Sequence, residues 1–350
     1  MKKFRIGLVG TGSICNDAHI PPLKSMPEIE IAAICDIDPK ALERTKKNLG
    51  NETIPAFLDH REMIKAGLGL DAVHVCTPNY AHSFIAVDFL NADVNVFVEK
   101  PMSINAEEGR KMLEAEKKSK AVLSVGHCWR YNNEMAALKK FVDAGRLGNI
   151  YYAKAISNRR RGIPGWGVFT DLEKQGGGPM IDCGCHALDT ALWLVGNPKP
   201  ISVMGCSYSK LGRNKEIGDM GGAWSWDRDN FNIEDFCTGY VRFENDMTMY
   251  IESSFAAHIE KDYFGVQLIG DKGGATTAPL KIFTDENRVM LNITPFYLQP
   301  AAPHADEIKD FYKALAEGSE IPIKAWQAYD VIHIIDAIYE SARTGETIKL

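Results

Sequence analysis

The sequence predicts an α/β domain with a doubly wound parallel sheet, followed by an α+β domain with an open-faced antiparallel sheet. The chain has 350 residues, more than one hydrophobic core usually sustains. Nearly continuous apolar runs alternate with helical segments up to residue 128, which is typical of a parallel sheet buried on both faces. Beyond residue 150, strand-like runs follow one another directly, as in an antiparallel sheet. We therefore expect domains at 1–128 and 129–350.

The first domain is predicted from short runs rich in β-branched residues and from the signals that bound its helices. Asp38 can cap a helix that starts at Pro39 and stops at Gly50. Asn105 and Glu108 have nearly the spacing of a capping box. The runs expected to form buried strands are Phe4–Val9, Ile29–Cys35, Ala72–Cys76, Val94–Val98 and Ala121–Val125.

The second domain is predicted from successive strands with turn residues between them. Alternation along Thr238, Tyr240 and Arg242 leaves one face of the sheet packed and the other available to solvent or to another subunit. We expect a homodimer or homotetramer joined through this sheet. The expected strands are Ile150–Ser157, Ile201–Ser209, Phe236–Phe243, Met247–Ala256 and Tyr263–Ile269, and two helices, Asp306–Glu317 and Ala325–Thr344, close the chain.

Composition narrows the classes of function. Forty Lys and Arg against 46 Asp and Glu give a net charge of −6, which argues against a nucleic-acid partner. No run approaches the roughly 20 apolar residues of a membrane helix, and the N-terminus lacks the apolar core of a signal peptide. We therefore expect a cytoplasmic protein with no membrane partner. Cys183, Cys185 and His186 offer too few ligands at poor spacing for zinc, so we predict no metal centre.

A glycine turn follows the first expected strand directly. Gly10 would allow the tight turn, and Gly12 would let a pyrophosphate approach the backbone at the start of a helix. Ser13 and Ile14 belong to the same expected contact, and Cys15 stands where a third glycine would complete the pattern. The turn alone is a weak signal, because Gly-x-Gly turns are common.

Asp36, at the end of the second expected strand, strengthens this interpretation. A carboxylate there can accept hydrogen bonds from an adenosine ribose diol and would repel the 2′-phosphate of NADP. The next residues, Ile37 and Asp38, supply no arginine for that phosphate. The pattern therefore predicts NAD in preference to NADP, although Asp36 could also simply cap or solvate a turn.

Polar residues follow two further buried strands, where ligands gather in an open α/β sheet. Thr77, Asn79 and His82 are placed to line the cofactor, though each could instead cap the next helix. Glu99 and Lys100 end the strand Val94–Val98 and are expected at the same cleft. Partial burial would make the Lys100 ammonium a strong hydrogen-bond donor to a substrate oxygen, although a lysine after a strand is more often a solvated turn residue.

A glycine-rich stretch at 176–178 leads into a helix whose Asp182 and His186 are four residues apart and share one face. The ordinary pKa of histidine suits proton transfer near neutral pH, and Asp182 can hold a substrate hydroxyl or orient the imidazole. The alternative is that Asp182 and His186 form an ordinary pair on the protein surface. Leu192 and Trp193, however, indicate that the helix also has a buried face.

Taken together, these motifs resemble the glucose–fructose oxidoreductase / inositol dehydrogenase / MocA (Gfo/Idh/MocA) family over essentially the whole chain. The resemblance rests on their order: the turn at Gly10–Cys15, Cys35-Asp36, Thr77-Pro78-Asn79, Glu99-Lys100-Pro101, Gly126-His127-x-x-Arg130-Tyr131, Gly177-Gly178-x-x-x-Asp182-x-Gly184-x-His186-x-x-Asp189 and 339–345. It implies a Rossmann domain, a sheet domain that often mediates oligomers, and a catalytic set of Lys100, Asp182 and His186. It also implies substrate contacts at Arg130 and Tyr131.

The resemblance implies an NAD-dependent dehydrogenase that acts on a secondary hydroxyl of a sugar, an inositol or a glycoside. In this hypothesis Lys100 and His186 bracket the carbinol oxygen, with His186 as the base, and Asp182 fixes the neighbouring hydroxyl. Trp166, beside Arg159–Arg161, could stack on a sugar or could be a surface anchor. His258 and His304 are weaker candidates for substrate contacts. A redox-cycling NAD-dependent glycosidase and a non-enzymatic NAD-binding regulator remain as alternatives.

Overall fold

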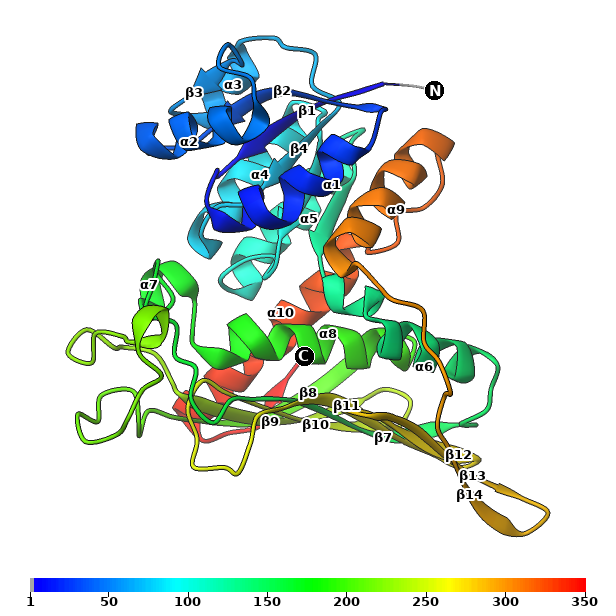
Figure 1. Cartoon of the computed structure of the whole chain (residues 1–350). Helices are drawn as coiled ribbons and strands as arrows, with labels where there is room; N and C mark the ends of the chain where they lie inside the picture. The colour runs from blue at the N-terminus through cyan, green and yellow to red at the C-terminus, as the bar shows by residue number, and fades with distance from the viewer. Residues whose placement is uncertain (1–2) are drawn as a thin grey trace. The chain divides into compact units, whose positions relative to one another are not determined.

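The computed structural model describes residues 3–350 and divides into two compact units (Figure 1). The first unit comprises the described residues through Cys128 together with Ala302–Tyr329, and the second comprises Trp129–Ala301 and Asp330–Leu350. Residues 1–2 of the first expected domain lie outside the described residues. The units differ from the expected ranges because a late segment of the chain, 302–329, packs with the first unit.

A six-stranded parallel sheet forms the centre of the first unit in the described part of the chain. Its order, β3-β2-β1-β4-β5-β6, reverses between β1 and β4, and ligands of such sheets bind outside the carboxyl ends of the strands at that point. The predicted doubly wound sheet is confirmed; the two-residue β3 has no apolar run that could have predicted it. The strands are β1 (Phe4–Val9), β2 (Ile29–Cys35), β3 (Ala56–Phe57), β4 (Ala72–Val75), β5 (Asn95–Glu99) and β6 (Leu123–Gly126).

Two helices of this unit begin where their sequence signals predict, whereas α9 begins at Pro303, three residues before the expected start at Asp306. The Asp38 side chain accepts a hydrogen bond from Lys40 N at 2.9 Å, and Gly50 ends the helix with a φ of 68°. Asn105 accepts one from Glu108 N at 2.9 Å. The helical segments are η1 (Cys15–His19), α1 (Ile20–Ser25), α2 (Pro39–Leu49), α3 (His60–Lys65), η2 (Asn79–Ala81), α4 (His82–Asn91), α5 (Ala106–Lys118) and α9 (Pro303–Glu317).

The apolar face of α9 explains why segment 302–329 belongs to the first unit. Phe311 packs edge-on against Phe97 of β5, and Tyr312 packs against Phe4 of β1, with ring centroids 5.4 Å apart in both pairs. Ile308 is buried in the same cluster. The boundary was not visible in the sequence because this helix has the same pattern as any amphipathic helix that follows a sheet domain.

A nine-stranded sheet forms the base of the second unit, counted over residues 3–350, in the order β14-β13-β12-β11-β7-β10-β9-β8-β15. All neighbours are antiparallel except β7 and β10, so the sheet is mixed where the sequence predicted an antiparallel one. The long connection between these two strands allows both to run in the same direction. The strands are β7 (Ile150–Asn158), β8 (Pro200–Tyr208), β9 (Phe236–Phe243), β10 (Thr248–Ser254), β11 (Tyr263–Gly270), β12 (Gly273–Thr277), β13 (Leu280–Glu286), β14 (Val289–Ile293) and β15 (Ile348–Lys349).

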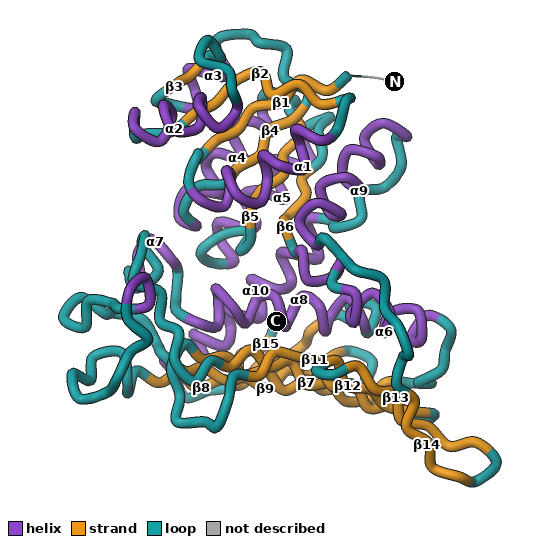
Figure 2. Tube along the Cα trace, in the orientation of Figure 1, coloured by secondary structure: helices purple, strands orange, loops and turns teal. Residues whose placement is uncertain are grey.

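Helices cover one face of this sheet (Figure 2). Helix α10 approaches it closely: a Cβ on Gly239 of β9 would lie 2.6 Å from Ile338 Cδ1, so only glycine fits there. The helical segments are η3 (Cys128–Tyr131), α6 (Asn133–Asp143), α7 (Leu172–Gln175), η4 (Met180–Gly184), α8 (Cys185–Leu194), η5 (Gly222–Trp224) and α10 (Ala325–Thr344). Among the described residues, no helix has both the length and the apolar character to cross a membrane.

Candidate active site

A pocket of about 560 Å³ lies at the carboxyl ends of β1, β2 and β4 in the first unit. Four of the predicted cofactor-binding residues line it: Gly10, Gly12, Asp36 and Thr77. Ser13 and Ile14 are exposed on the adjoining turn. The strand order reverses at this place, so the pocket lies where a doubly wound sheet binds its ligand.

The glycine turn has the shape that a pyrophosphate needs. Gly10 has a φ of +83°, and a Cβ there would lie 2.6 Å from Thr77 N, so a larger residue would collide with the neighbouring strand end. At Gly12 a Cβ would meet nothing within 4 Å. The second glycine therefore faces open space, which allows a bulky anion to approach the backbone.

Asp36 is held in place by the same turn. Its Oδ2 accepts hydrogen bonds from Thr11 N at 2.7 Å and from Thr11 Oγ1 at 3.1 Å, and its Oδ1 accepts one from Asp38 N at 2.9 Å. The carboxylate is therefore preorganised at the pocket wall, with further acceptor capacity on Oδ1. Sequence reasoning missed Thr11, because nothing in its position marks it as a support of Asp36.

The pocket also offers a donor that needs a ligand. Thr77 Oγ1 is buried and has no hydrogen-bond partner within residues 3–350. A bound dinucleotide would supply the missing partner, and the open face of Gly12 and the carboxylate of Asp36 fit its pyrophosphate and ribose. The residues present therefore fit NAD. Two arginines missed by sequence reasoning, Arg44 and Arg61, also line the pocket.

Two other predicted cofactor residues are buried beside the pocket. Asn79 begins η2 and is 8% exposed. His82 has Nδ1 at 2.7 Å from the Pro101 carbonyl and Nε2 at 2.8 Å from the Thr77 carbonyl. Both ring nitrogens face backbone carbonyls, so His82 links the end of β4 to the end of β5.

Glu99 and Lys100 follow one another at the carboxyl end of β5. Glu99 Oε1 lies 2.8 Å from His19 Nε2, and Glu99 Oε2 accepts a hydrogen bond from Lys100 N at 3.1 Å. Burial acts to raise the pKa of Glu99, but the hydrogen bond and charge of His19, with the charge of Lys100, outweigh it and lower that pKa. Glu99 is therefore an ionised, internally paired carboxylate, and Lys100 is the half-buried cation next to it.

Asp182 and His186 lie in the second unit, one turn apart. Asp182 sits in η4, a π-helical turn that passes directly into α8 at Cys185. Such turns are rare and occur frequently at functional sites. The Cys183 thiol donates to Asp182 Oδ2 at 3.3 Å, and the Cys185 thiol to the Asp182 carbonyl at 3.2 Å. These thiols therefore brace the turn.

A buried carboxylate fixes the start of this turn. Glu234 accepts hydrogen bonds from Gly178 N at 2.8 Å and from Met180 N at 3.2 Å, and the Tyr339 hydroxyl donates to it at 2.8 Å. Burial raises the pKa of Glu234. Three segments distant in sequence thus meet at the glycine-rich stretch, and they set the orientation of Asp182.

The His186 ring is oriented by aromatic packing. It stacks on Trp129 with centroids 5.1 Å apart and planes inclined by 15°, and Trp129 in turn meets Phe264 edge-on at 6.0 Å. His186 remains half-buried, so the imidazole is both oriented and accessible.

The family resemblance implied that Arg130 contacts the substrate, but its side chain pairs with another residue of the protein. Its Nε donates to Asp189 Oδ2 at 2.8 Å and its Nη2 to Asp189 Oδ1 at 2.6 Å. Both side chains are buried, so this bidentate ion pair ties η3 to α8 and supports the helix that carries His186. Tyr131, the other expected substrate contact, is half-buried at the end of η3.

The arginine run of the second unit supports a loop. Arg159 donates to the Gly162 carbonyl at 3.0 Å, Arg160 to the Glu260 carbonyl at 2.9 Å, and Arg161 to the Gly218 carbonyl at 3.1 Å. Trp166 is 43% exposed and packs edge-on against Trp224 at 4.9 Å.

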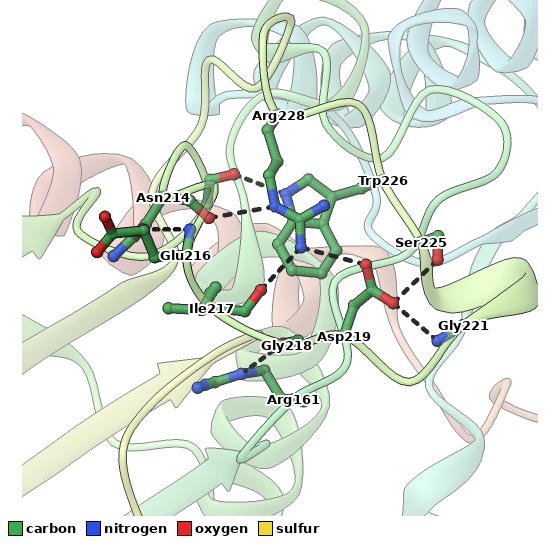
Figure 3. Close-up of polar contacts among 11 residues, drawn as sticks. Arg161, Asn214, Glu216, Ile217, Gly218, Asp219, Gly221, Ser225, Trp226 and Arg228 are labelled. Carbon is green, nitrogen blue, oxygen red and sulfur yellow. Dashed lines mark hydrogen bonds and ion pairs between the residues drawn. The ribbon is translucent and has the colours of Figure 1, made fainter.

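The neighbouring loop, residues 212–228, is braced by Arg228 (Figure 3). Its guanidinium donates to the carbonyls of Asn214 and Ile217 and to Asp219 Oδ2, each at 3.1 Å, and lies over the Trp226 ring. The indole of Trp226 donates to the Gly212 carbonyl at 2.6 Å. These contacts order the loop that carries Trp224, against which Trp166 packs, and Trp166 remains an exposed aromatic surface.

The remaining histidines differ in setting. His258 is exposed in the second unit. His304 lies at the start of α9, where burial lowers its pKa, and its imidazole, the Cys128 thiol and the Glu307 carboxylate have ligand atoms within 4.8 Å of one another. Cys128 and Glu307 make further contacts, so this group does not by itself define a metal centre.

Two family models together match nearly the whole chain. Residues 4–127 match an oxidoreductase family with an NAD-binding Rossmann fold, and residues 139–350 match the C-terminal alpha/beta domain of the same family. The chain belongs to the Gfo/Idh/MocA oxidoreductase family. It is therefore an NAD(P)-dependent oxidoreductase, and the family resemblance predicted from its motifs is confirmed.

Relatives of this Gfo/Idh/MocA oxidoreductase include sugar and inositol dehydrogenases. The D-glucoside 3-dehydrogenase of Escherichia coli (strain K12) is 32% identical over 99% of this chain and 97% of that protein. The inositol 2-dehydrogenase of Rhizobium meliloti (strain 1021) is 26% identical over 99% of each chain. A levoglucosan dehydrogenase solved with NADH and levoglucosan has the same fold, with a TM-score of 0.83, 21% identity and 99% of each chain covered.

In this Gfo/Idh/MocA oxidoreductase, sequence reasoning missed the roles of residues that hold the candidate site residues in place from distant parts of the sequence. Glu234 and Tyr339 hold the turn of Asp182, and Thr11 holds Asp36. An acidic residue just before a strand is no signal by itself, since exposed loops carry many. A tyrosine in a closing helix is equally ordinary, and only the tertiary contacts reveal its role.

Proposed function

We propose that this oxidoreductase uses NAD to oxidise a secondary hydroxyl of a carbohydrate ring, with D-glucosides as the first substrate class to test. The observation that carries the proposal is the 32% identity to a D-glucoside 3-dehydrogenase over 99% of this chain. The dinucleotide pocket around Gly12, Asp36 and Thr77 supports the cofactor half of the reaction.

The proposed chemistry needs a donor, a base and a group that orients the substrate. When bound, NAD accepts the hydrogen and the electron pair of the substrate C–H bond. Lys100 donates a hydrogen bond to the carbinol oxygen and stabilises its developing negative charge. His186, oriented by Trp129, takes the hydroxyl proton, and Asp182 accepts a hydrogen bond from the neighbouring hydroxyl. Trp166 offers an exposed aromatic ring for stacking against a sugar face.

A substrate panel tests the proposal. Purified protein is mixed with NAD and with alkyl D-glucosides, free aldoses, inositols and anhydrosugars, and NADH formation is followed by absorbance. We expect reduction with at least one of these classes. Cleavage of a glucoside that requires NAD but yields no net NADH would instead favour the redox-cycling glycosidase.

Asp36 is proposed to select NAD over NADP. The Asp36→Ser variant loses a charged acceptor for the ribose diol. Without that carboxylate, Arg44 on the same pocket wall is available to pair with a 2′-phosphate. A hydrogen bond to a charged group contributes about 1.5–3 kcal/mol, so the ratio of kcat/KM for NAD to that for NADP should fall by about 10- to 100-fold. Steady-state kinetics with both cofactors measure it. Equal kcat/KM for the two cofactors in the unchanged protein would rule the role out.

We also propose that copies of the chain associate through the outer face of the nine-stranded sheet. That face carries exposed Met204 and Tyr240, 56% and 43% accessible, and Met204 lies directly opposite Tyr240 across β8 and β9. Exposed apolar groups in this arrangement are typical of an interaction surface. The absence of a nucleic-acid partner and the cytoplasmic location stay predictions of the sequence.

Met204→Glu tests the association. A carboxylate buried against a partner is costly, so we expect a homodimer or homotetramer to become a smaller species in analytical ultracentrifugation. Exposed Cys206, on the same strand, should react faster with a thiol reagent in the variant. A monomer before the change, or an unchanged sedimentation coefficient after it, would contradict the proposal.

A further inference from the structure

A continuous line of buried polar side chains crosses the first unit beside Lys100. Glu99 Oε1 lies 2.8 Å from His19 Nε2, and the other nitrogen of that ring, Nδ1, lies 2.8 Å from His74 Nδ1. His74 Nε2 lies 2.8 Å from the Tyr312 hydroxyl. The four side chains come from β5, η1, β4 and α9, and the most exposed of them, Glu99, is only 6% accessible.

Counting hydrogens shows how the line is bonded when Glu99 is ionised. His19 Nε2–H donates to the carboxylate, so the Nδ1 of a neutral His19 accepts from His74 Nδ1–H. His74 Nε2 then accepts from the Tyr312 hydroxyl. Burial supports this arrangement, since it lowers the pKa of His74 well below its ordinary value and raises that of Tyr312 well above. One hydrogen then lies between the two atoms of each of the three contacts, and each donor points along the line toward Glu99.

A second arrangement satisfies the same three pairs with one more proton. Here His19 Nδ1–H donates to His74 Nδ1, and His74 Nε2–H donates to the Tyr312 oxygen. The Glu99–His19 pair holds the additional proton, and the Tyr312 hydrogen turns away from the line. No heavy atom has to move between the two arrangements. They differ by a single proton, which enters or leaves at Tyr312.

Each end of the line meets a different environment. At the inner end, Lys100 follows Glu99 directly and its charge acts on that carboxylate. At the outer end, Tyr312 lines a surface depression of about 710 Å³, together with the charged residues Glu28, Lys309 and Lys313. One end therefore lies beside the proposed catalytic lysine, and the other belongs to a side chain that is 1% exposed and lines a surface depression.

We propose that Glu99, His19, His74 and Tyr312 form a proton relay between Lys100 and solvent. The inference rests on the proposed function, in which a secondary alcohol and NAD⁺ give a ketone, NADH and one proton. As the carbinol O–H bond breaks, His186 takes its proton. The Lys100 ammonium gives one proton to the Glu99–His19 pair and is then reprotonated by the proton that His186 took.

Before the proton reaches the Glu99–His19 pair, both imidazole hydrogens point toward Tyr312 and the pair lacks the additional proton, so the incoming proton completes the second arrangement. The line then changes to the first arrangement and Tyr312 releases one proton to the depression. Rotation of the two imidazole rings restores the starting positions of the hydrogens. Ketone reduction takes one proton in by the reverse path.

Other ionisable groups act on the two ends of the relay, so its pH profile would include them. Those acting on Glu99 are Lys100, His304, Cys76 and His82, and the one acting on Tyr312 is Asp71. For this reason the test compares variants at a single pH.

The relay is first tested without cofactor or substrate, by NMR of ¹⁵N-histidine-labelled protein. Tyr312→Phe keeps the ring and removes the outer hydroxyl. We expect exchange of the His19 and His74 ring hydrogens with solvent to slow by about 10-fold or more, because exchange must then wait for local opening of the core. His74→Gln keeps hydrogen-bonding groups but cannot pass a proton. It should slow the exchange of the His19 ring hydrogen with solvent in the same way.

Ser124→Ala is the matched control. It removes another buried hydrogen bond between the sheet and segment 302–329, from Ser124 Oγ to the Ile323 carbonyl at 3.0 Å, without touching the relay. The control should exchange like the unchanged protein. Exchange that is equal in Tyr312→Phe and in the unchanged protein would overturn the relay.

A second readout follows turnover. NADH absorbance and a pH indicator are recorded together after rapid mixing in weak buffer. We expect proton release to accompany NADH formation in the unchanged protein and to lag behind it in Tyr312→Phe. Simultaneous release in the variant would contradict use of the relay in catalysis. Failure of every sugar to reduce NAD would reject the proposed function, while the exchange measurement would still decide the relay.

Discussion

Replacing Lys100 with methionine is expected to lower kcat/KM for sugar oxidation by about 10²- to 10⁴-fold, the range that a proton-transferring side chain contributes. Methionine keeps most of the apolar stem and removes the ammonium that stabilises charge on the carbinol oxygen. We expect kcat to fall far more than the affinity for NAD. Steady-state kinetics measure the first quantity, and fluorescence titration of NAD measures the second.

Lys111→Met is the matched control for this experiment. Lys111 lies on α5 in the same unit, is 51% exposed and forms ion pairs with Glu107 and Glu108. Its loss should leave kcat/KM nearly unchanged, because exposed pairs of this kind contribute little. Retention of activity in Lys100→Met comparable to that of the control would remove Lys100 from the catalytic set.

Asp189→Asn is expected to lower the free energy of unfolding by about 3–5 kcal/mol, because it leaves the buried Arg130 guanidinium without its counter-charge. The pair is 4% and 1% exposed and bidentate, so the arginine cannot regain water without opening η3 and α8. Urea unfolding followed by tryptophan fluorescence measures the loss.

An exposed ion pair of the same unit provides the comparison. Asp143 pairs with Lys139 on α6 and is 59% exposed, so Asp143→Asn should cost less than about 1 kcal/mol. The double variant Arg130→Met, Asp189→Leu removes both charges and should recover much of the stability lost in Asp189→Asn. A loss in Asp189→Asn no larger than in Asp143→Asn would show that the buried pair has no such role.

The cofactor half of the site could be predicted from sequence because its parts follow one another along the chain. A strand, a glycine turn, a helix and a second strand ending in Asp36 place Gly12 and Asp36 at one sheet edge by topology alone. The helix signals at Asp38 and Asn105 act within a few residues and were equally visible.

The supports of the site could not be predicted because they come from distant segments. Arg130 has the sequence appearance of a substrate ligand, yet Asp189, 59 residues away, takes its guanidinium. Segment 302–329 joins the first unit through Phe311 and Tyr312, and that contact also completes the line from Glu99. Residue patterns report local periodicity, whereas these roles depend on which buried polar groups meet.

The most direct test of the central claim follows the hydrogen itself. The protein is incubated with NAD and a methyl D-glucoside that carries deuterium on C3, the position named in the E. coli relative, and both products are analysed by mass spectrometry. The proposed function predicts one equivalent of deuterated NADH for each 3-keto glucoside formed. Intact substrate without labelled NADH, or release of methanol with no net NADH, would contradict it.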